Sequence, residues 1–226
     1  MAILEKNLAP RQQIIRMKYA CFVSHRSGGD AMCKIVEKFR QGLEDQLDLL
    51  TRLRTVYVDA DRLKGGDYFN KSLAKALCQS CCMILLFDPD YFDLNHDYCA
   101  REYHAMLDLE KQRYPHLGRN AQDKSLIIPV VIRGENSLPG EIKSNRQYFN
   151  FEKTLLEPAD FKKRACIKEL QKIADVVYHR MRLLKSCDCW ECADFDFPDS
   201  SNQKFKNWLK NLTDEIPSPP MPGSSG

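Results

Sequence analysis

The feature that most constrains the fold is an apolar run at residues 82–87, which Asp88 and Pro89 bring to an end. A strand with one solvated face alternates apolar and polar residues, whereas a strand buried on both faces of a parallel sheet is apolar throughout. Residues 82–87 therefore predict the central strand of a covered sheet. A polar loop, DPDYFDLNHD, follows this strand.

A helix is predicted after this loop. Cys99, Tyr103 and Met106 recur at helical spacing, and Asp97 stands where an N-cap residue is expected. Glu102 lies roughly 80 to 90° from the centre of this apolar stripe, given 3.6 residues per turn. We expect its carboxylate at the margin between the buried and the open face of the helix, where it could face a cleft.

The order of strand, loop and helix repeats along the chain. Further strands are predicted at residues 19–24, 55–59, 125–132 and 147–151, and further helices after Asp30 as N-cap, from about Asp67, and at residues 160–184. This alternation indicates an α/β fold, a flavodoxin-like three-layer sandwich around a central five-stranded parallel sheet. Pro129 lacks a backbone donor, so we expect it near a strand end or a bulge.

One rim of this sheet is the expected binding site. Ligands of such sheets bind beyond the carboxyl ends of the strands. The loops that start at Ser24, Asp59 and Phe87 should share that rim, and Glu102 should look onto it.

The length of 226 residues accommodates one domain with short appendages. We assign residues 1–18 to an N-terminal extension, residues 19–185 to the domain and residues 186–226 to a tail. Phe205, Trp208 and Leu209 hint at a short helix in the tail, and the closing EIPSPPMPGSSG has the composition of a disordered segment. We place no catalytic residue in the tail.

Charge and hydropathy narrow the class of function. The net charge of +3 is too small to indicate a nucleic-acid-binding protein. No apolar run approaches the roughly 18 residues of a membrane-spanning helix, and the N-terminus lacks the layout of a secretory signal. We therefore expect a cytoplasmic protein with neither a membrane nor a nucleic-acid partner.

Ten cysteines raise the question of disulfides. Cys21, Cys78, Cys82 and Cys99 fall within or beside apolar patterns, where a free cysteine behaves as a small hydrophobic residue. We therefore expect the cysteines to be reduced and mostly structural.

A separate cluster, Cys187, Cys189 and Cys192, has the spacing C-x-C-x-x-C. With His179 as a fourth ligand it could bind zinc. The spacing departs from standard zinc patterns, so incidental thiols or a partner-dependent site fit it better. We predict no metal site.

The order of motifs resembles the Toll/interleukin receptor domain, or TIR domain, in its bacterial NAD-cleaving form. The match rests on YACFVSHRS for the first strand and turn, VYVDADRLKGGD for the second strand and the BB loop, CCMILLFDPDYFDLNHDYCAREYHAM for the third strand and the catalytic helix, and QYFNF for the last strand. The resemblance covers residues 17–184. It implies the TIR fold and an enzyme that cleaves NAD+ between nicotinamide and ribose, giving ADP-ribose or a cyclic variant, in a bacterial defence or signalling system.

The resemblance also assigns residues. Glu102 takes the position of the catalytic glutamate, and Tyr98 stands where the family often has tryptophan, with an aromatic ring retained. Cleavage of the bond develops positive charge on the ribose, which a fixed carboxylate stabilises. Nicotinamide leaves as a neutral base, so no cofactor is required and NAD+ is the substrate. The alternative for Glu102 is a solvated residue in the first helical turn.

Other residues of the rim are candidate ligands of NAD+. Ser24, His25 and Arg26 follow the first strand and could hold phosphates or ribose, although a capped turn explains them as well. Asp59 could orient ribose. Arg62 belongs to a charged, glycine-containing loop at residues 62–67 that is otherwise a turn.

By resemblance, this loop is a gate and a contact between neighbouring TIR domains, and a separate sensor or activator protein is an expected partner. Two other classes stay open. One is a non-enzymatic adaptor that acts through contacts between TIR domains. The other is a flavodoxin-like nucleotide-binding or receiver domain, which Asp59 and Asp61 alone do not establish.

Overall fold

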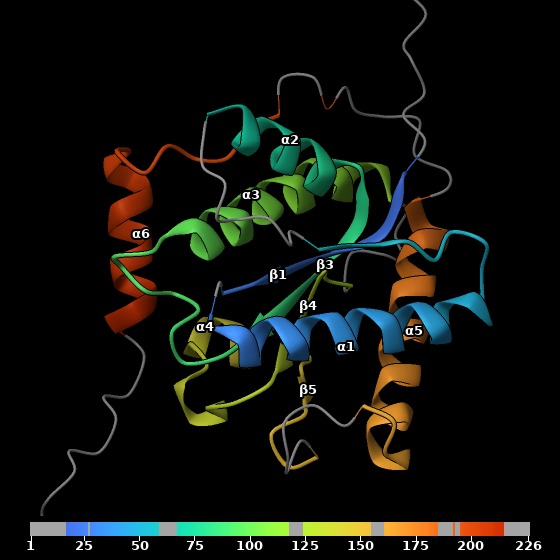
Figure 1. Ribbon diagram of the computed structural model, residues 1–226. Helices are drawn as coiled ribbons and strands as arrows, with labels where there is room; N and C mark the ends of the chain where they lie inside the picture. Colours follow the sequence, from blue (N-terminus) through green and yellow to red (C-terminus); the bar gives the residue numbers. More distant parts are fainter. Residues whose placement is uncertain are drawn as a thin grey trace, which may run out of the picture.

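The computed structural model describes residues 17–26, 28–58, 67–117, 124–154, 161–184, 192 and 195–214. Strands and helices alternate through most of this chain (Figure 1). The elements are β1 (Tyr19–His25), α1 (Asp30–Asp48), β2 (Val56–Val58), α2 (Asp67–Cys78), β3 (Ser80–Phe87), α3 (Tyr98–Arg113), β4 (Ile127–Val131), α4 (Gly140–Asn145), β5 (Phe149–Asn150), α5 (Arg164–Leu184) and α6 (Gln203–Asp214), with short 3-10 turns at Tyr114–His116 and Glu135–Ser137.

The five strands form one parallel sheet in the order β2-β1-β3-β4-β5. All eight residues of β3 are buried, and β3 pairs with β1 on one side and with β4 on the other. The apolar run therefore forms the central strand, as its composition predicts. The predicted α/β sandwich with five parallel strands is confirmed.

Helices cover both faces of the sheet. In Figure 1, α2 and α3 lie on one face and α1 and α5 on the other. Helices α1 and α5 pack closely where Gly42 meets Leu170, because a Cβ at Gly42 would lie 2.8 Å from Leu170 Cδ1. On the other face, the carboxyl end of β1 meets the first turn of α3, where Cys99 Sγ donates to the His25 carbonyl at 3.2 Å.

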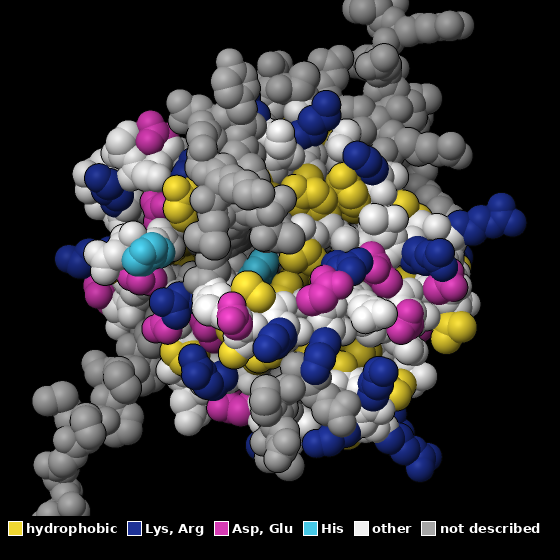
Figure 2. Space-filling view, in the orientation of Figure 1, with side chains coloured by type: hydrophobic (Ala, Val, Ile, Leu, Met, Phe, Trp, Pro, Cys, Tyr) yellow, Lys and Arg dark blue, Asp and Glu magenta, His cyan; other side chains and the backbone are white. Residues whose placement is uncertain are grey.

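The outer face of α1 carries charges of both signs. Arg40 lies between Glu37 and Glu44 at 2.5 and 2.6 Å, in pairs spaced by one helical turn. Figure 2 shows basic and acidic side chains interspersed over this helix.

Pro129 lies in the middle of β4, so the expectation that it marks a strand end or bulge is wrong. Its missing donor costs nothing there. The Ile132 N–H donates to the Phe87 carbonyl on the β3 side, so by alternation the nitrogen of Pro129 faces the β5 side. Pairing with β5 begins only at Val130, opposite Phe149.

The expectation that the cysteines are reduced is wrong for two of them. Cys78, the last residue of α2, forms a disulfide with Cys192, across a sequence separation of 114 residues. Cys192 is therefore neither a free thiol nor a zinc ligand in this structure. The described cysteines that stay free are Cys21, Cys33, Cys81, Cys82, Cys99 and Cys166.

The helix hinted at in the tail is present as α6, with Phe205, Leu209 and Leu212 buried. The division into residues 1–18, 19–185 and 186–226 stays a prediction, and the closing segment expected to be disordered lies outside the described residues. In the part of the chain that the structure describes, no helix combines the length and the apolar character needed to cross a bilayer.

Candidate active site

A buried hydrogen-bonded group lies at the carboxyl end of β1. Ser24 lies near the end of that strand, and Glu102 lies at the start of the second turn of α3. Both residues are buried, with 0% and 1% of their surface exposed. The Ser24 hydroxyl donates to Glu102 Oε2. Ser24 Oγ also lies 2.5 Å from the hydroxyl of Tyr91, a residue of the loop after β3.

The chemistry of the three groups fixes the direction of these bonds. A serine hydroxyl has one proton, and an ionised carboxylate only accepts. Because Ser24 donates to Glu102, the Tyr91 hydroxyl must donate to Ser24. The result is a chain of donors, from Tyr91 through Ser24 to Glu102, that ends on the carboxylate.

Glu102 is more buried than its helical angle predicts. The expectation placed it at the margin of the buried face, but only 1% of it is exposed. The spacing of residues along a helix gives a direction and not the neighbours on that side. Here the end of β1 lies on that side and covers the carboxylate.

Tyr91 is held by aromatic packing and by a turn. Its ring centroid lies 6.4 Å from that of Phe87 and 4.8 Å from that of Phe92, and its backbone N–H donates to the Asp88 carbonyl at 3.0 Å. Sequence reasoning missed Tyr91. The available signal was an aromatic residue placed two positions after the Asp-Pro end of the central strand.

Charged side chains border this group. Asp88 is buried, and burial raises the pKa of its carboxyl, to which Asp90 adds while Arg26 and Arg133 oppose. Arg26 pairs with Asp90 at 2.5 Å on the partly exposed rim. The structure thus places Arg26 beside the loop that carries Tyr91, with its guanidinium engaged by a carboxylate.

His25 joins β1 to the start of α3. Its side chain is buried, and its carbonyl accepts a bond from Cys99 Sγ at 3.2 Å. This contact fixes the first turn of α3 against the strand that carries Ser24.

Among the remaining predicted ligands, the structure describes only Tyr98, which lies on the surface. Tyr98 is 56% exposed, and its ring lies 5.9 Å from the Arg101 guanidinium. Asp59, Asp61 and Arg62 lie outside the described residues. Their predicted roles stay predictions.

The predicted helix caps are partly wrong. Asp97 occupies the N-cap position of α3, but its side chain makes no capping bond. Asp30 is the first helical residue of α1, after Gly29 at the N-cap, and Asp67 is the first residue of α2. A carboxylate in the first turn still favours a helix through its dipole.

A second buried glutamate lies two turns further along α3. Glu110 accepts bonds from Arg146 at 2.9 and 3.0 Å, from the Ser125 hydroxyl at 2.7 Å and from the backbone at the start of β4. Burial raises the pKa of Glu110, but the bonds and charge of Arg146 outweigh this, so the pKa lies below its usual value. This cluster is a neutralised ion pair.

The described residues hold no group of three or more histidine, cysteine or acidic side chains able to bind a metal.

The sequence of residues 21–170 matches the family model of the TIR domain. The chain belongs to the TIR domain family. The match spans β1 to the first part of α5, and so includes Ser24, Tyr91 and Glu102. No curated protein and no solved structure shows significant similarity to the chain.

The boundaries of the match separate two parts of this TIR domain protein. The sheet, α3 and the buried group lie inside the matched residues, whereas Cys192 and α6 lie beyond them. The predicted resemblance is confirmed at the level of the family.

Proposed function

We propose that this TIR domain is an NAD+ glycohydrolase in which Glu102 is the catalytic residue. The observation that carries the proposal is a buried carboxylate, held by the Ser24 hydroxyl at the carboxyl end of a parallel strand, in a chain of this family. The products would be nicotinamide and ADP-ribose or a cyclic form of it.

The proposed chemistry uses the carboxylate electrostatically. As the bond between nicotinamide and C1 of the ribose breaks, positive charge develops on the ribose, and Glu102 stabilises it. Nicotinamide leaves as a neutral base with the bonding electrons, so a second carboxylic acid is not needed. Water or a nucleophile of the substrate itself then attacks C1. No cofactor takes part in this scheme.

The hydrogen bonds of Ser24 support such a role. A catalytic carboxylate must keep one orientation while charge develops, because reorientation during the reaction raises the barrier. The donor chain from Tyr91 through Ser24 orients the carboxylate of Glu102, which we assign to the ribose. Arg26, His25, Tyr98, Asp59 and Arg62 are proposed contacts of the substrate.

We propose that activation of the protein exposes the carboxylate of Glu102 to the substrate. With 1% of Glu102 exposed, NAD+ reaches it only after the rim opens. We propose that contacts between TIR domains, induced by a separate sensor or activator, open the rim, and that the protein acts in the cytoplasm in bacterial defence or signalling.

The alternative is a non-catalytic TIR adaptor that works through contacts between TIR domains. The same burial favours it, because a buried glutamate bonded to a serine hydroxyl is also what a purely structural residue looks like. Activity separates the two.

The test follows nicotinamide release by chromatography. The full chain is incubated with NAD+ at high protein concentration, with and without a crowding agent. We expect release by the wild type, a loss on the order of a thousandfold in Glu102→Gln, and wild-type rates in the control Glu37→Gln, whose side chain is 60% exposed on α1. Equal rates in wild type and Glu102→Gln would remove the catalytic assignment, and silence of the assembled wild type would favour the adaptor.

A further inference from the structure

The segment from Cys192 to Asp214 lies beyond the family match and attaches to α3 near both ends of that helix. At one end, the Cys78–Cys192 disulfide joins the segment to the end of α2. At the other end, α6 packs beside the start of α3 (Figure 1). We call residues 192 and 195–214 the C-terminal strap.

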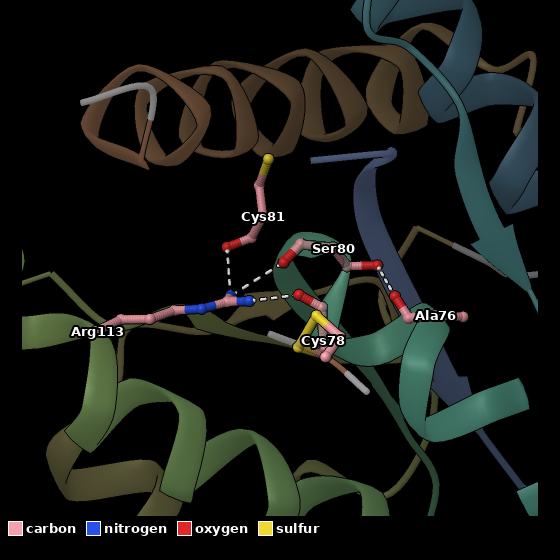
Figure 3. The surroundings of a disulfide bond; sticks show 6 residues. Ala76, Cys78, Ser80, Cys81 and Arg113 are labelled. Carbon is pink, nitrogen blue, oxygen red and sulfur yellow. Dashed lines mark hydrogen bonds between the residues drawn. A yellow bond between two sulfur atoms is a disulfide. The ribbon is translucent and has the colours of Figure 1, made fainter. Parts of the chain in front are cut away.

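Arg113 of α3 holds the end of α2 to which the disulfide ties the strap. This guanidinium is fully buried and donates to the carbonyls of Cys78 at 2.7 Å and Ser80 at 2.9 Å. Figure 3 shows it reaching from α3 to the turn between α2 and β3, next to the disulfide, with a longer bond to Cys81. The last turn of α3 and the root of the strap therefore share one buried anchor.

The other end of the strap contacts the residues on either side of Glu102. Arg101 Nε donates to the Pro198 carbonyl at 2.7 Å, and its guanidinium lies 5.9 Å from the Phe197 ring. Tyr103 stacks on Trp208, with centroids 6.0 Å apart and ring planes 15° from parallel.

His104 completes this contact. Its ring meets Trp208 edge to face at 4.9 Å and Phe205 at 5.7 Å. Phe205 and Leu209 of α6 are 2% and 3% exposed, so the helix is docked by apolar burial and not by a few polar bonds.

These contacts hold α3 from the side opposite to its catalytic candidate. Glu102 points to β1, whereas its neighbours Arg101, Tyr103 and His104 meet the strap. A small rotation or shift of α3 would move the carboxylate relative to Ser24, and contacts on both sides oppose such motion.

Most of the described cysteines are free thiols. Six described cysteines are free, four of them within or beside the sheet and α3, and one disulfide is formed. Disulfides are rare in reducing compartments, and those that occur there are usually transient, catalytic or redox-sensing.

We propose that the C-terminal strap is a redox-releasable clamp on α3, closed by the Cys78–Cys192 disulfide and opened when a dithiol reduces that bond. One thiolate of the dithiol attacks a sulfur of the disulfide and forms a mixed disulfide, and the other cysteine leaves as a thiolate. The second thiol of the reductant then displaces the bound cysteine. Two electrons and two protons pass to Cys78 and Cys192, and the dithiol becomes a disulfide.

Burial of the disulfide limits the rate of its reduction. Cys78 and Cys192 are 2% and 4% exposed, so the reductant reaches the bond only when the strap opens locally. Once reduced, Cys192 is no longer tied to the core, and the chain entropy that the bond had removed again favours release.

The first test uses amide hydrogen exchange of the full chain with and without dithiothreitol, after peptide mapping under non-reducing conditions has verified the Cys78–Cys192 bond. We expect exchange in residues 203–214 to rise at least about tenfold on reduction, with a smaller rise in residues 101–104. Cys192→Ser should exchange fast in both conditions. Cys33→Ser, which changes an exposed free cysteine, should respond to dithiothreitol as the wild type does.

A second pair of variants tests the clamp with the disulfide intact. Trp208→Ala should speed exchange in residues 101–104, and Trp208→Phe should restore slow exchange because a ring still stacks on Tyr103. Absence of the Cys78–Cys192 peptide, or exchange in residues 203–214 that ignores both dithiothreitol and Cys192→Ser, overturns the proposal.

The effect on catalysis rests on the proposed function. If Glu102 is catalytic, the reduced protein and Trp208→Ala should lose kcat with little change in KM, and Trp208→Phe should recover it. The two proposals fail separately. If the strap responds to dithiothreitol but the protein never releases nicotinamide, the proposed enzymatic function is wrong and the clamp stands. If the protein has Glu102-dependent activity but the strap does not respond, only the clamp proposal is wrong.

Discussion

Helix α3 carries two buried glutamates whose surroundings differ. Glu110 is met by the guanidinium of Arg146, the Ser125 hydroxyl and backbone N–H groups, so its charge is balanced in place. Glu102, two turns away, accepts a hydrogen bond from the Ser24 hydroxyl, which is a neutral donor. Burial alone therefore does not distinguish a structural carboxylate from a catalytic candidate, whereas the effect of neutralising each carboxylate does.

The largest expected effect is a contrast between the two glutamates: neutralising Glu102 should reduce activity, and neutralising Glu110 should reduce stability. Glu102→Gln should reduce NAD+ cleavage by about a thousandfold, near 4 kcal/mol, while changing the free energy of unfolding by less than about 1 kcal/mol, since the amide still accepts from Ser24. Nicotinamide release and urea unfolding measure the two quantities. A large loss of stability in Glu102→Gln would make Glu102 a structural residue like Glu110.

Glu110→Gln should act on stability. The substitution leaves Arg146, at 11% side-chain exposure, without its counter-charge, and the free energy of unfolding should fall by about 3 kcal/mol. Urea unfolding of Glu110→Gln measures this loss. Glu169→Gln, which changes a partly exposed glutamate on α5, is the control. Stability within about 0.5 kcal/mol of wild type would contradict the buried ion pair.

The same pair predicts a pH dependence. Because the pKa of Glu110 is lower in the folded protein than in the unfolded chain, the folded state holds fewer protons on this group. Its contribution is therefore present above the unfolded pKa of about 4.3 and is lost as pH falls through the folded pKa. Urea unfolding from pH 7 down to about pH 2 should show a shallower acid loss in Glu110→Gln than in wild type, and parallel curves would contradict this assignment.

Ser24→Ala tests whether orientation matters at Glu102. Removal of the hydroxyl should cost about 2 kcal/mol of stability, because two buried groups lose their shared partner. If the carboxylate is catalytic, kcat of the folded variant should fall about tenfold, beyond any loss caused by a smaller folded fraction, with KM nearly constant. Rates measured well below the unfolding temperature separate the two. An unchanged kcat would mean that Ser24 has no orienting role.

Tyr91→Phe should give the smallest effect. It keeps the ring against Phe87 and Phe92 and removes the hydroxyl that donates to Ser24, at a cost of about 1 kcal/mol. The loss of kcat should be smaller than in Ser24→Ala, because Ser24 still donates to Glu102. A larger loss in Tyr91→Phe would place Tyr91 in direct contact with the substrate.

The sequence indicated more of the fold than of the site. Residues 82–87 were identified as a central strand because strand periodicity is local, and a strand without polar positions has no solvated face. The position of Glu102 on a helix after that strand was equally local. The burial of Glu102 could not be predicted in this way, because the angular position of a residue on a helix does not say whether another segment covers that side.

By itself, then, the sequence determined the alternation of strands and helices, the parallel sheet and the helix that carries Glu102, all of which follow from patterns within about 20 residues. Only the tertiary structure decided that Ser24, Tyr91 and Glu102 meet, that Cys78 pairs with Cys192, and that α6 returns to the start of α3. These contacts join residues 67 to 114 positions apart. Such pairs form when the whole chain closes around its core, and no local pattern encodes which distant side chain arrives at a given place.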